Sequence, residues 1–196
     1  MSVLLIAGSP SDRSRTAAVL EAVGQRLELR GQQVDRLRVR DLSPQALLLA
    51  DFGHPTVSRA VGQVARAEVI VVATPVYKAA YSGVLKVFLD LLAQDAFKGK
   101  TVLPLATGGS PHHMLALDYA LRPVLQSLGA KQILSGIYAT DAQVPLTPEG
   151  AYQVAPDIAA RLDEAVNTLL RDTLQVQQTN AGRFADVPFS QVLCSV

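Results

Sequence analysis

The sequence has almost no cysteine, almost no net charge and no long hydrophobic run. Its one cysteine, Cys194, excludes an internal disulfide framework or a cysteine metal cluster, and favours a reducing compartment. A net charge of +1 without a dense run of Lys or Arg excludes the electrostatic footprint of a nucleic-acid or membrane-surface binder. The short apolar run over residues 1–7 follows no basic segment and is far too short to span a membrane. We therefore expect a cytoplasmic protein that binds a small soluble ligand.

The length and composition suit one domain. A chain of 196 residues with 49% hydrophobic residues can supply a core that covers both faces of a sheet. We expect the folded domain over residues 1–172. A mobile tail is expected over residues 173–196, because residues 175–185 are polar with scattered small side chains.

Apolar runs of strand length alternate with stretches of helical spacing. Residues 3–7 are apolar and end at Gly-Ser-Pro, and residues 68–74 form a β-branched run that Pro75 ends. The other expected strands are residues 34–39, 101–107 and 132–139. The expected helices run from residue 14 to near residue 31 and over residues 55–67, 82–92, 114–128 and 157–170.

This alternation predicts an α/β fold with a doubly wound parallel sheet and helices on both faces. Five strands favour the flavodoxin-like order 2-1-3-4-5. In such a sheet the ligand lies outside the carboxyl ends of the strands, next to the loops after the first and third strands. Pro104 is unfavourable for the expected strand over residues 101–107, because a proline removes a hydrogen-bond donor from the ladder of a central strand.

The loop over residues 8–16 joins the first expected strand to a helix N-terminus. Free backbone N–H groups and the helix dipole attract anions there, and the loop adds hydroxyls and two arginines. It lacks the lysine of a Walker P-loop and the three spaced glycines of a dinucleotide-binding loop, so a terminal monophosphate is the expected ligand. From this loop alone, an ordinary turn in which Ser14 caps the helix stays open.

Two further loops, over residues 74–83 and 106–110, follow the third and fourth expected strands and meet at the same crevice. A flat tricyclic ring needs apolar or aromatic neighbours and backbone donors that approach closely. Pro75, Tyr77 and a glycine pair offer both. The alternatives are that Tyr77 and Tyr81 only pack within their loop, and that Lys78 is a solvated charge.

Three segments carry a resemblance to a known family. They are GSPSDRSRT, ATPVYKAAYSGVLK and GKTVLPLATGG, and their order and spacing are similar to those of NADPH-dependent FMN reductases. Their sequences are most similar to those of the FMN reductases of bacterial alkanesulfonate assimilation. The resemblance covers about residues 3–170. With the loop chemistry above, it implies a set of flavin-binding residues. These are Ser9, Ser11, Ser14, Arg15 and Thr16 for the phosphate, and Pro75, Val76, Tyr77, Lys78, Thr107, Gly108, Gly109 and Ser110 for the isoalloxazine.

The resemblance implies hydride transfer from NADPH, or NADH, to FMN, and release of the reduced flavin to a flavin-dependent alkanesulfonate monooxygenase. It also implies a homotetramer or dimer. We expect no catalytic side chain, because hydride transfer is the chemistry of the cofactors themselves. A quinone or azo-compound reductase that retains FMN stays open, as does a non-catalytic electron carrier, although flavodoxin carriers are typically strongly acidic and this chain is nearly neutral.

Pro123 lies inside the expected helix over residues 114–128. The carbonyl of Tyr119 then loses its regular partner, so we expect a kink or a π-bulge there, of structural or functional origin. The segment ALDYALRP is similar to reductases in which an inserted tyrosine forms a π-helix at a tetramer interface and accompanies flavin release. The resemblance implies that role for Tyr119.

Neither a metal site nor a hydrolase site is expected. His112 and His113 are adjacent, so they cannot both face one metal on a regular element, and no HExxH spacing accompanies them. Ser9 follows a strand but lacks the GxSxG elbow of a nucleophile.

Overall fold

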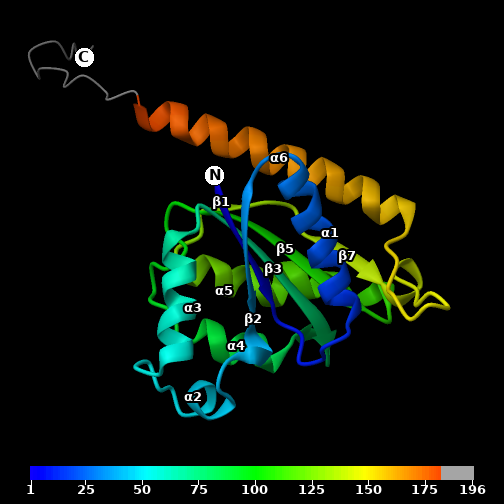
Figure 1. Cartoon of the computed structure of the whole chain (residues 1–196), viewed down its shortest axis with the longest axis horizontal. Helices are drawn as coiled ribbons and strands as arrows, with labels where there is room; N and C mark the ends of the chain where they lie inside the picture. The colour runs from blue at the N-terminus through cyan, green and yellow to red at the C-terminus, as the bar shows by residue number, and fades with distance from the viewer. Residues whose placement is uncertain (182–196) are drawn as a thin grey trace, which may run out of the picture.

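The chain folds as alternating strands and helices (Figure 1). The computed structural model describes the backbone of residues 1–181 and the side chains of residues 1–171. The strands are β1 (Ser2–Ala7), β2 (Gln33–Arg38), β3 (Val69–Tyr77), β4 (Ala80–Tyr81), β5 (Thr101–Gly108), β6 (Gln132–Ile133) and β7 (Ile137–Thr140). The α-helices are α1 (Arg15–Leu29), α2 (Pro44–Leu48), α3 (Pro55–Arg66), α4 (Gly83–Leu89), α5 (Arg122–Ser127) and α6 (Pro156–Ala181). Shorter turns are the 3₁₀ segments η1 (Val39–Asp41), η2 (Pro111–Leu115) and η4 (Asp141–Gln143) and the π-helix η3 (Leu117–Leu121).

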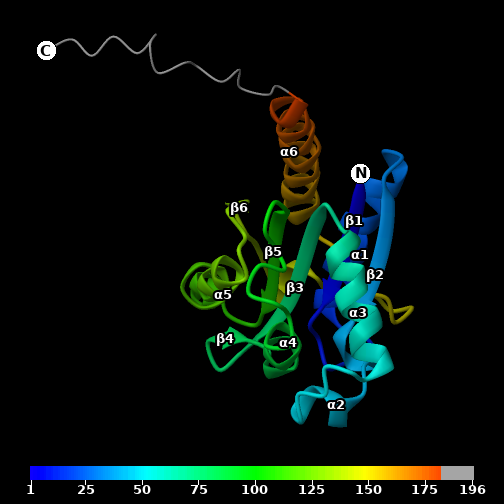
Figure 2. The ribbon, with the colours of Figure 1, turned by 90° about the vertical axis from the view of Figure 1, so that its left-hand side faces the viewer.

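A parallel sheet of order β2-β1-β3-β5-β6 forms the centre of the molecule (Figure 1, Figure 2). β7 continues the position of β6 beside β5, and β4 folds back antiparallel on the end of β3. The predicted order of five positions is therefore confirmed. The chain leaves β1 toward one edge and returns to β3 on the other side, so the carboxyl ends of β1 and β3 flank the crevice of the sheet.

Helices cover both faces of the sheet, and the central strands β1, β3 and β5 supply side chains to both cores. Side chains alternate between the faces along a strand. Leu5 and Val71 pack with α1 and α6, whereas Ile6 and Val72 pack with α3, α4 and α5. Because these strands are buried on both faces, they appear in the sequence as continuous apolar runs.

The fifth sheet position is interrupted beside Pro104. One strand was predicted over residues 132–139, and the structure has two short ones, β6 and β7. Leu103 and Pro104 of β5 lie opposite three residues, 134–136, which separate β6 from β7. The chain beside β5 therefore contains one extra residue, as in a β-bulge.

Hydrogen bonding explains why the interruption occurs there. The amide of Thr101 donates toward β3, to the carbonyl of Glu68 at 3.3 Å, whereas the carbonyl of Val102 accepts from the amide of Leu134 at 2.9 Å. Successive residues of β5 thus direct their backbone polar groups alternately toward β3 and toward β6 and β7. By this alternation the nitrogen of Pro104 faces β6 and β7. Since proline has no N–H, a regular ladder would lose a bond at this point, and the bulge removes the need for one.

The segment predicted as one helix over residues 114–128 is irregular. The 3₁₀ turn η2 is followed by the π-helix η3, and only Arg122–Ser127 is α-helical. The predicted π-bulge at Tyr119 is confirmed, and the side chain of Tyr119 is 79% exposed. Pro123 lies in the first turn of α5, where the missing N–H costs little.

Helix α6 is longer than predicted. It was expected to end at Leu170, but its backbone is helical over Pro156–Ala181, which includes the first residues of the predicted tail. Its buried side chains repeat at helical spacing and pack on α1: Ile158, Leu162, Val166 and Leu169. The rest of the predicted tail, residues 182–196 with Cys194, lies outside the described residues.

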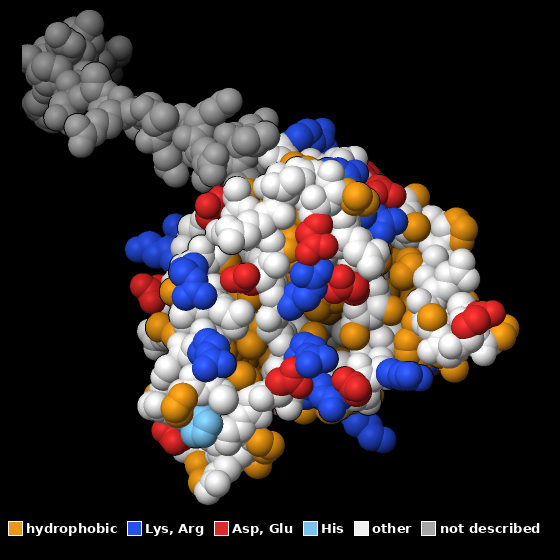
Figure 3. Space-filling view, viewed as in Figure 1, with side chains coloured by type: hydrophobic (Ala, Val, Ile, Leu, Met, Phe, Trp, Pro, Cys, Tyr) orange, Lys and Arg blue, Asp and Glu red, His pale blue; other side chains and the backbone are white. Residues whose placement is uncertain are grey.

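Charges of both signs lie side by side on the surface. Figure 3 shows Lys and Arg interspersed with Asp and Glu over the face that carries α1 and α6. Arg36 on the edge strand β2 contacts Glu21 at 2.7 Å and Glu28 at 2.8 Å. Exposed pairs of this kind contribute about 0–1 kcal/mol each. Within residues 1–181 no helix has both the length and the apolar composition to cross a membrane.

Candidate functional site

The three loops predicted to hold the ligand meet in one cavity at the carboxyl ends of β1, β3 and β5. The cavity has a volume of ≈ 260 Å³. Its lining residues are Ser9, Ser11, Arg13, Ser14, Arg15, Thr16, Pro75, Val76, Tyr77, Thr107, Gly108, Gly109, Asp141 and Tyr152. Of the residues predicted for the site, Lys78 and Ser110 are not in this lining. Arg13, Asp141 and Tyr152 line the cavity without having been predicted.

The loop between β1 and α1 presents a helix N-terminus to the cavity. The Oγ of Ser14 accepts a hydrogen bond from the amide of Ala17 at 3.1 Å, so Ser14 caps α1, as in the turn that the sequence left open. The buried Ser9 accepts from the amide of Ser11 at 3.2 Å. No acidic residue lies in the first turn of α1, so the positive end of the helix dipole is open to an anion.

Gly8 lets this loop pass close to β3 and α4. Its amide donates to the carbonyl of Ala73 at 2.8 Å, and its carbonyl accepts from the hydroxyl of Ser82. A Cβ at this position would lie 2.8 Å from the Cβ of Leu85. A larger residue therefore has no room at the start of the loop.

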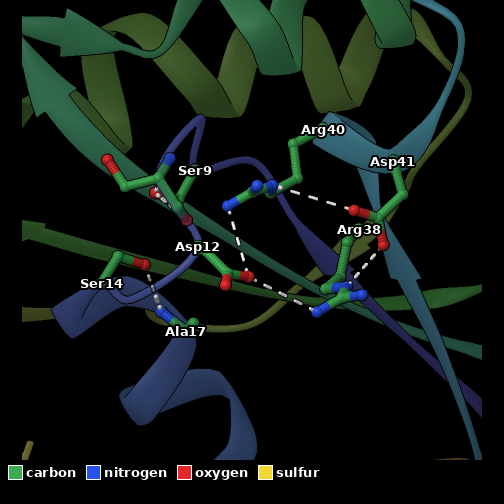
Figure 4. A network of polar contacts seen from close by, with 8 residues as sticks. Ser9, Asp12, Ser14, Ala17, Arg38, Arg40 and Asp41 are labelled. Carbon is green, nitrogen blue, oxygen red and sulfur yellow. Dashed lines mark hydrogen bonds and ion pairs between the residues drawn. The ribbon is translucent and has the colours of Figure 1, made fainter.

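Asp12, at the tip of the β1–α1 loop, forms ion pairs with two arginines at the end of β2 (Figure 4). Its carboxylate lies 3.3 Å from Arg40 and 3.7 Å from Arg38, and Arg38 also contacts Asp41 at 2.6 Å. These partners orient the Asp12 side chain toward β2, and Asp12 is not in the cavity lining.

The loop after β3 is a tight hairpin to β4. Its two turn residues, Lys78 and Ala79, have φ values of 50° and 63°, the left-handed conformation of a type I′ turn. Neither residue is Gly, Asn or Asp, so the turn holds some backbone strain. Tyr77, immediately before the turn, lines the cavity and is 50% exposed.

The loop after β5 is held in place by a hydrogen bond from Tyr138 of β7. The Tyr138 hydroxyl donates to the carbonyl of Ser110 at 2.6 Å. A Cβ on Gly108 would lie 2.5 Å from the same hydroxyl oxygen, so a larger residue at this position would displace the tyrosine hydroxyl. Burial, and to a lesser degree the charge of Asp141, raise the pKa of Tyr138, which keeps the hydroxyl protonated and able to donate.

Arg15 is held by a segment that follows β7. Its Nε donates to the carbonyl of Val144 at 3.1 Å, and its Nη1 lies 3.6 Å from Oδ2 of Asp141. Its guanidinium lies 5.2 Å from the ring centroid of Tyr152, within the range of a cation–π contact. The one sequence signal for this part of the site was that Asp141 follows the fifth strand, whose carboxyl end reaches the same edge of the sheet.

The cavity contains donors, aromatic surface and closely approaching backbone, but no paired acid and base. Within the described side chains, no group of three His, Cys, Asp or Glu residues comes together as metal ligands would. His112 and His113 lie on η2. The arrangement is suited to binding an anionic group next to a flat ring.

Comparison with known proteins agrees with this chemistry. The model of a family described as NADPH-dependent FMN reductase matches residues 1–163. The chain is 45% identical over 168 residues to FMN reductase (NADPH) of Escherichia coli strain K12, covering 86% of this chain and 87% of that protein. It is 47% identical over 175 residues to FMN reductase (NADPH) of Pseudomonas putida strain KT2440, covering 89% and 85%.

Solved structures are similar as well. The apo form of an NADH:FMN oxidoreductase matches with a TM-score of 0.79 and 41% identity, covering 87% of this chain and 89% of that one. A Streptococcus pneumonia TIGR4 flavodoxin matches with a TM-score of 0.60 and 13% identity, covering 87% and 98%. Similarity at that identity shows the fold alone, and the predicted flavodoxin-like fold is confirmed.

Proposed function

The chain belongs to the family of NADPH-dependent FMN reductases, and we propose that the cavity between its three loops binds the phosphate end of FMN. The protein is an NADPH-dependent FMN reductase whose substrates are NADPH and FMN. The observation that supports this binding site is the meeting of an open helix N-terminus with the loops after β3 and β5 in one cavity.

The phosphate contacts that we propose come from the β1–α1 loop: Ser9, Ser11, Ser14, Arg15 and Thr16. Ser14 accepts from the amide of Ala17, so its own hydroxyl hydrogen is free to donate to a phosphate oxygen. Hydrogen bonds to a charged group contribute about 1.5–3 kcal/mol each, and micromolar affinity corresponds to about 8 kcal/mol. A few such donors are enough for a flavin that binds and dissociates.

The ring contacts that we propose come from the loops after β3 and β5: Pro75, Val76, Tyr77, Lys78, Thr107, Gly108, Gly109 and Ser110. The cavity of ≈ 260 Å³ lies just below the range of about 300–1,000 Å³ that is common for whole ligands. It therefore suits the phosphate end, with the ring extending past the half-exposed Tyr77 toward solvent. A ring in this position keeps one face open for the nicotinamide.

The reaction needs positioning and charge balance from the protein rather than an acid or a base. Hydride passes from C4 of the nicotinamide to N5 of the flavin, which is the chemistry of the two substrates themselves. The protein holds the two rings at a reacting distance of about 3–3.5 Å. Arg15 and the N-terminus of α1 balance the phosphate charge, and the loop held by Tyr138 supplies backbone groups next to the ring.

We further propose that the reduced flavin passes to a flavin-dependent monooxygenase that acts on alkanesulfonates in the cytoplasm. This proposal is supported by the sequences of the three segments that resemble the reductases of alkanesulfonate assimilation. We also propose that the π-helix lies at the interface of a homotetramer or dimer. Three large side chains on η2 and η3 are exposed in the single chain and would be covered by a second copy: Met114, Leu115 and Tyr119.

An assay with free flavin tests the proposed function. Purified protein should be nearly colourless and should oxidise NADPH only when FMN is added, at a rate that saturates with FMN. The kcat/KM values for NADPH and NADH establish the nucleotide preference. A tightly bound yellow flavin, with quinone or azo-dye reduction that ignores added FMN, would instead indicate a reductase that retains its flavin.

A further inference from the structure

Asp141 places a negative charge in a cavity that is otherwise suited to an anion. Among the described residues of the cavity lining it is the only acidic one, and Arg13 and Arg15 are the basic ones. Its Oδ2 lies 3.6 Å from Nη1 of Arg15 and would lie 3.8 Å from a Cβ on Gly109. The carboxylate thus lies close to the β1–α1 loop, which is proposed to bind the phosphate, and to the glycine pair Gly108 and Gly109.

The turn η4 fixes the position of this carboxylate. Thr140 and Gln143 form a capping box around the turn, and Gln143 also donates to Asp157 at the start of α6, at 2.6 Å. The amide of Val144 donates to the carbonyl of Asp141 at 3.3 Å. Since the Val144 carbonyl accepts from Arg15, a single short turn provides both polar partners of that arginine.

We propose that Asp141 competes with the flavin phosphate for Arg15 and thereby keeps FMN exchangeable. This inference rests on the proposed function, because it requires the phosphate in this cavity. A phosphate monoester carries a charge of about −1.5 to −2 at neutral pH, so it is attracted to Arg15 and repelled by the neighbouring carboxylate. When the phosphate leaves, Asp141 is in place to pair with the arginine again, which stabilises the empty site relative to the FMN complex.

Replacing Asp141 by its neutral isostere tests the proposal. Asp141→Asn keeps the size of the side chain and removes its charge. We expect the full-length variant to bind FMN about 5- to 30-fold more tightly than the wild type, which is about 1–2 kcal/mol. The dissociation constant is measured by quenching of flavin fluorescence. The gain should shrink as ionic strength rises, because the carboxylate is 48% exposed and salt screens its charge.

A second ligand and a matched variant make the test specific. Riboflavin has the same ring and side chain as FMN but no phosphate, so its affinity should be equal in the wild type and in Asp141→Asn. Asp163→Asn is the control variant. The Asp163 carboxylate is also 48% exposed and pairs with an arginine, Arg26, at 3.0 Å, but it lies outside the cavity. Its removal should leave FMN affinity unchanged.

Three results would overturn the proposal. FMN affinity unchanged in Asp141→Asn would show that the carboxylate does not compete. Equal tightening of FMN and riboflavin would show that Asp141 acts on the ring or the ribityl chain instead. Weaker FMN binding would show that Asp141 positions Arg15 for the phosphate. If the wild type itself binds no FMN, the proposed function fails and this inference fails with it.

Discussion

The hydroxyl oxygens of Thr16 and Thr107 lie 2.6 Å apart and join the first turn of α1 to the carboxyl end of β5. Both side chains are buried, so no bulk water replaces either partner. One hydroxyl donates to the other, and the accepting hydroxyl keeps its own hydrogen for a further acceptor. The pair therefore sets the spacing between the loop proposed for the phosphate and the loop proposed for the ring.

Breaking this pair on one side should destabilise the protein. Thr16→Val leaves the Thr107 hydroxyl buried without a partner, so we expect the free energy of unfolding in urea to fall by about 1–3 kcal/mol. Thr16→Ser keeps a hydroxyl and is the conservative control. The double variant Thr16→Val/Thr107→Val removes both polar groups and should cost less than the sum of the single variants. Strict additivity would show that the two hydroxyls do not interact.

Gly108→Ala should disturb the loop after β5. The added Cβ would lie 2.5 Å from the Tyr138 hydroxyl oxygen, and overpacking of this kind costs about 1–3 kcal/mol. FMN affinity should fall as well, because Ser110 shifts with the tyrosine. Adding Tyr138→Phe removes the clashing oxygen and should restore part of the lost stability.

A glycine far from the cavity provides the comparison for that experiment. Gly62 lies in α3, where an added Cβ has no neighbour closer than 3.4 Å. Gly62→Ala should stabilise the helix by up to about 1 kcal/mol. If Gly108→Ala behaved like Gly62→Ala, the tight contact with Tyr138 would not exist in solution.

The hydrogen bond from Tyr138 should disappear in alkaline solution. Burial raises the pKa of this hydroxyl above its ordinary value of about 10, so its contribution to stability is complete below about pH 10 and is lost as the pH rises through the higher folded-state value. The free energy of unfolding of the wild type, minus that of Tyr138→Phe, should therefore decrease above about pH 10. A difference that stays constant with pH contradicts a protonated donor at this position.

Deleting Tyr119 should remove the π-helix. A π-bulge contains one more residue than the regular α-helix, so the deletion lets η3 continue into α5 as ordinary helix. We expect a change in flavin retention or in oligomeric state, measured by flavin absorbance of the purified protein and by light scattering with and without FMN. Tyr119→Ala keeps the extra residue and separates the effect of the ring from that of the bulge. A deletion variant with unchanged assembly and colour rejects the proposed role.

The elements that could be predicted are those whose signal is local. β3 is buried on both faces and therefore appears as a β-branched run. The start of α4 also has a local signal, because the Oγ of Ser82 accepts from the amide of Leu85 three residues later. The spacing of Tyr119 and Pro123 predicted a kink or a π-bulge, and the resemblance to the reductases favoured the π-helix. α2 was not predicted, although Ser43 and Pro44 form the usual pattern of a helix start.

The features that escaped prediction depend on distant pairings. The contact of Arg15 with Asp141 depends on where the segment after β7 lies, and Tyr152 enters the cavity from that same segment. Nothing in the residues next to Tyr152 indicates a binding role. The break between β6 and β7 was not predicted, because its cause lies on a neighbouring strand, at Pro104 of β5.

That break decides which layer of the protein a tyrosine belongs to. Side chains alternate along a strand, so one extra residue between β6 and β7 exchanges the faces of everything after it. As a result Tyr138 pairs with Ala106 and lies under the Gly108 loop, and Ile137 lies on the opposite face. With the register of β6 continued, Ile137 would stand opposite Ala106 and the tyrosine would face α6. A member of this family that gained or lost one residue between β6 and β7 would therefore turn Tyr138 away from the Gly108 loop.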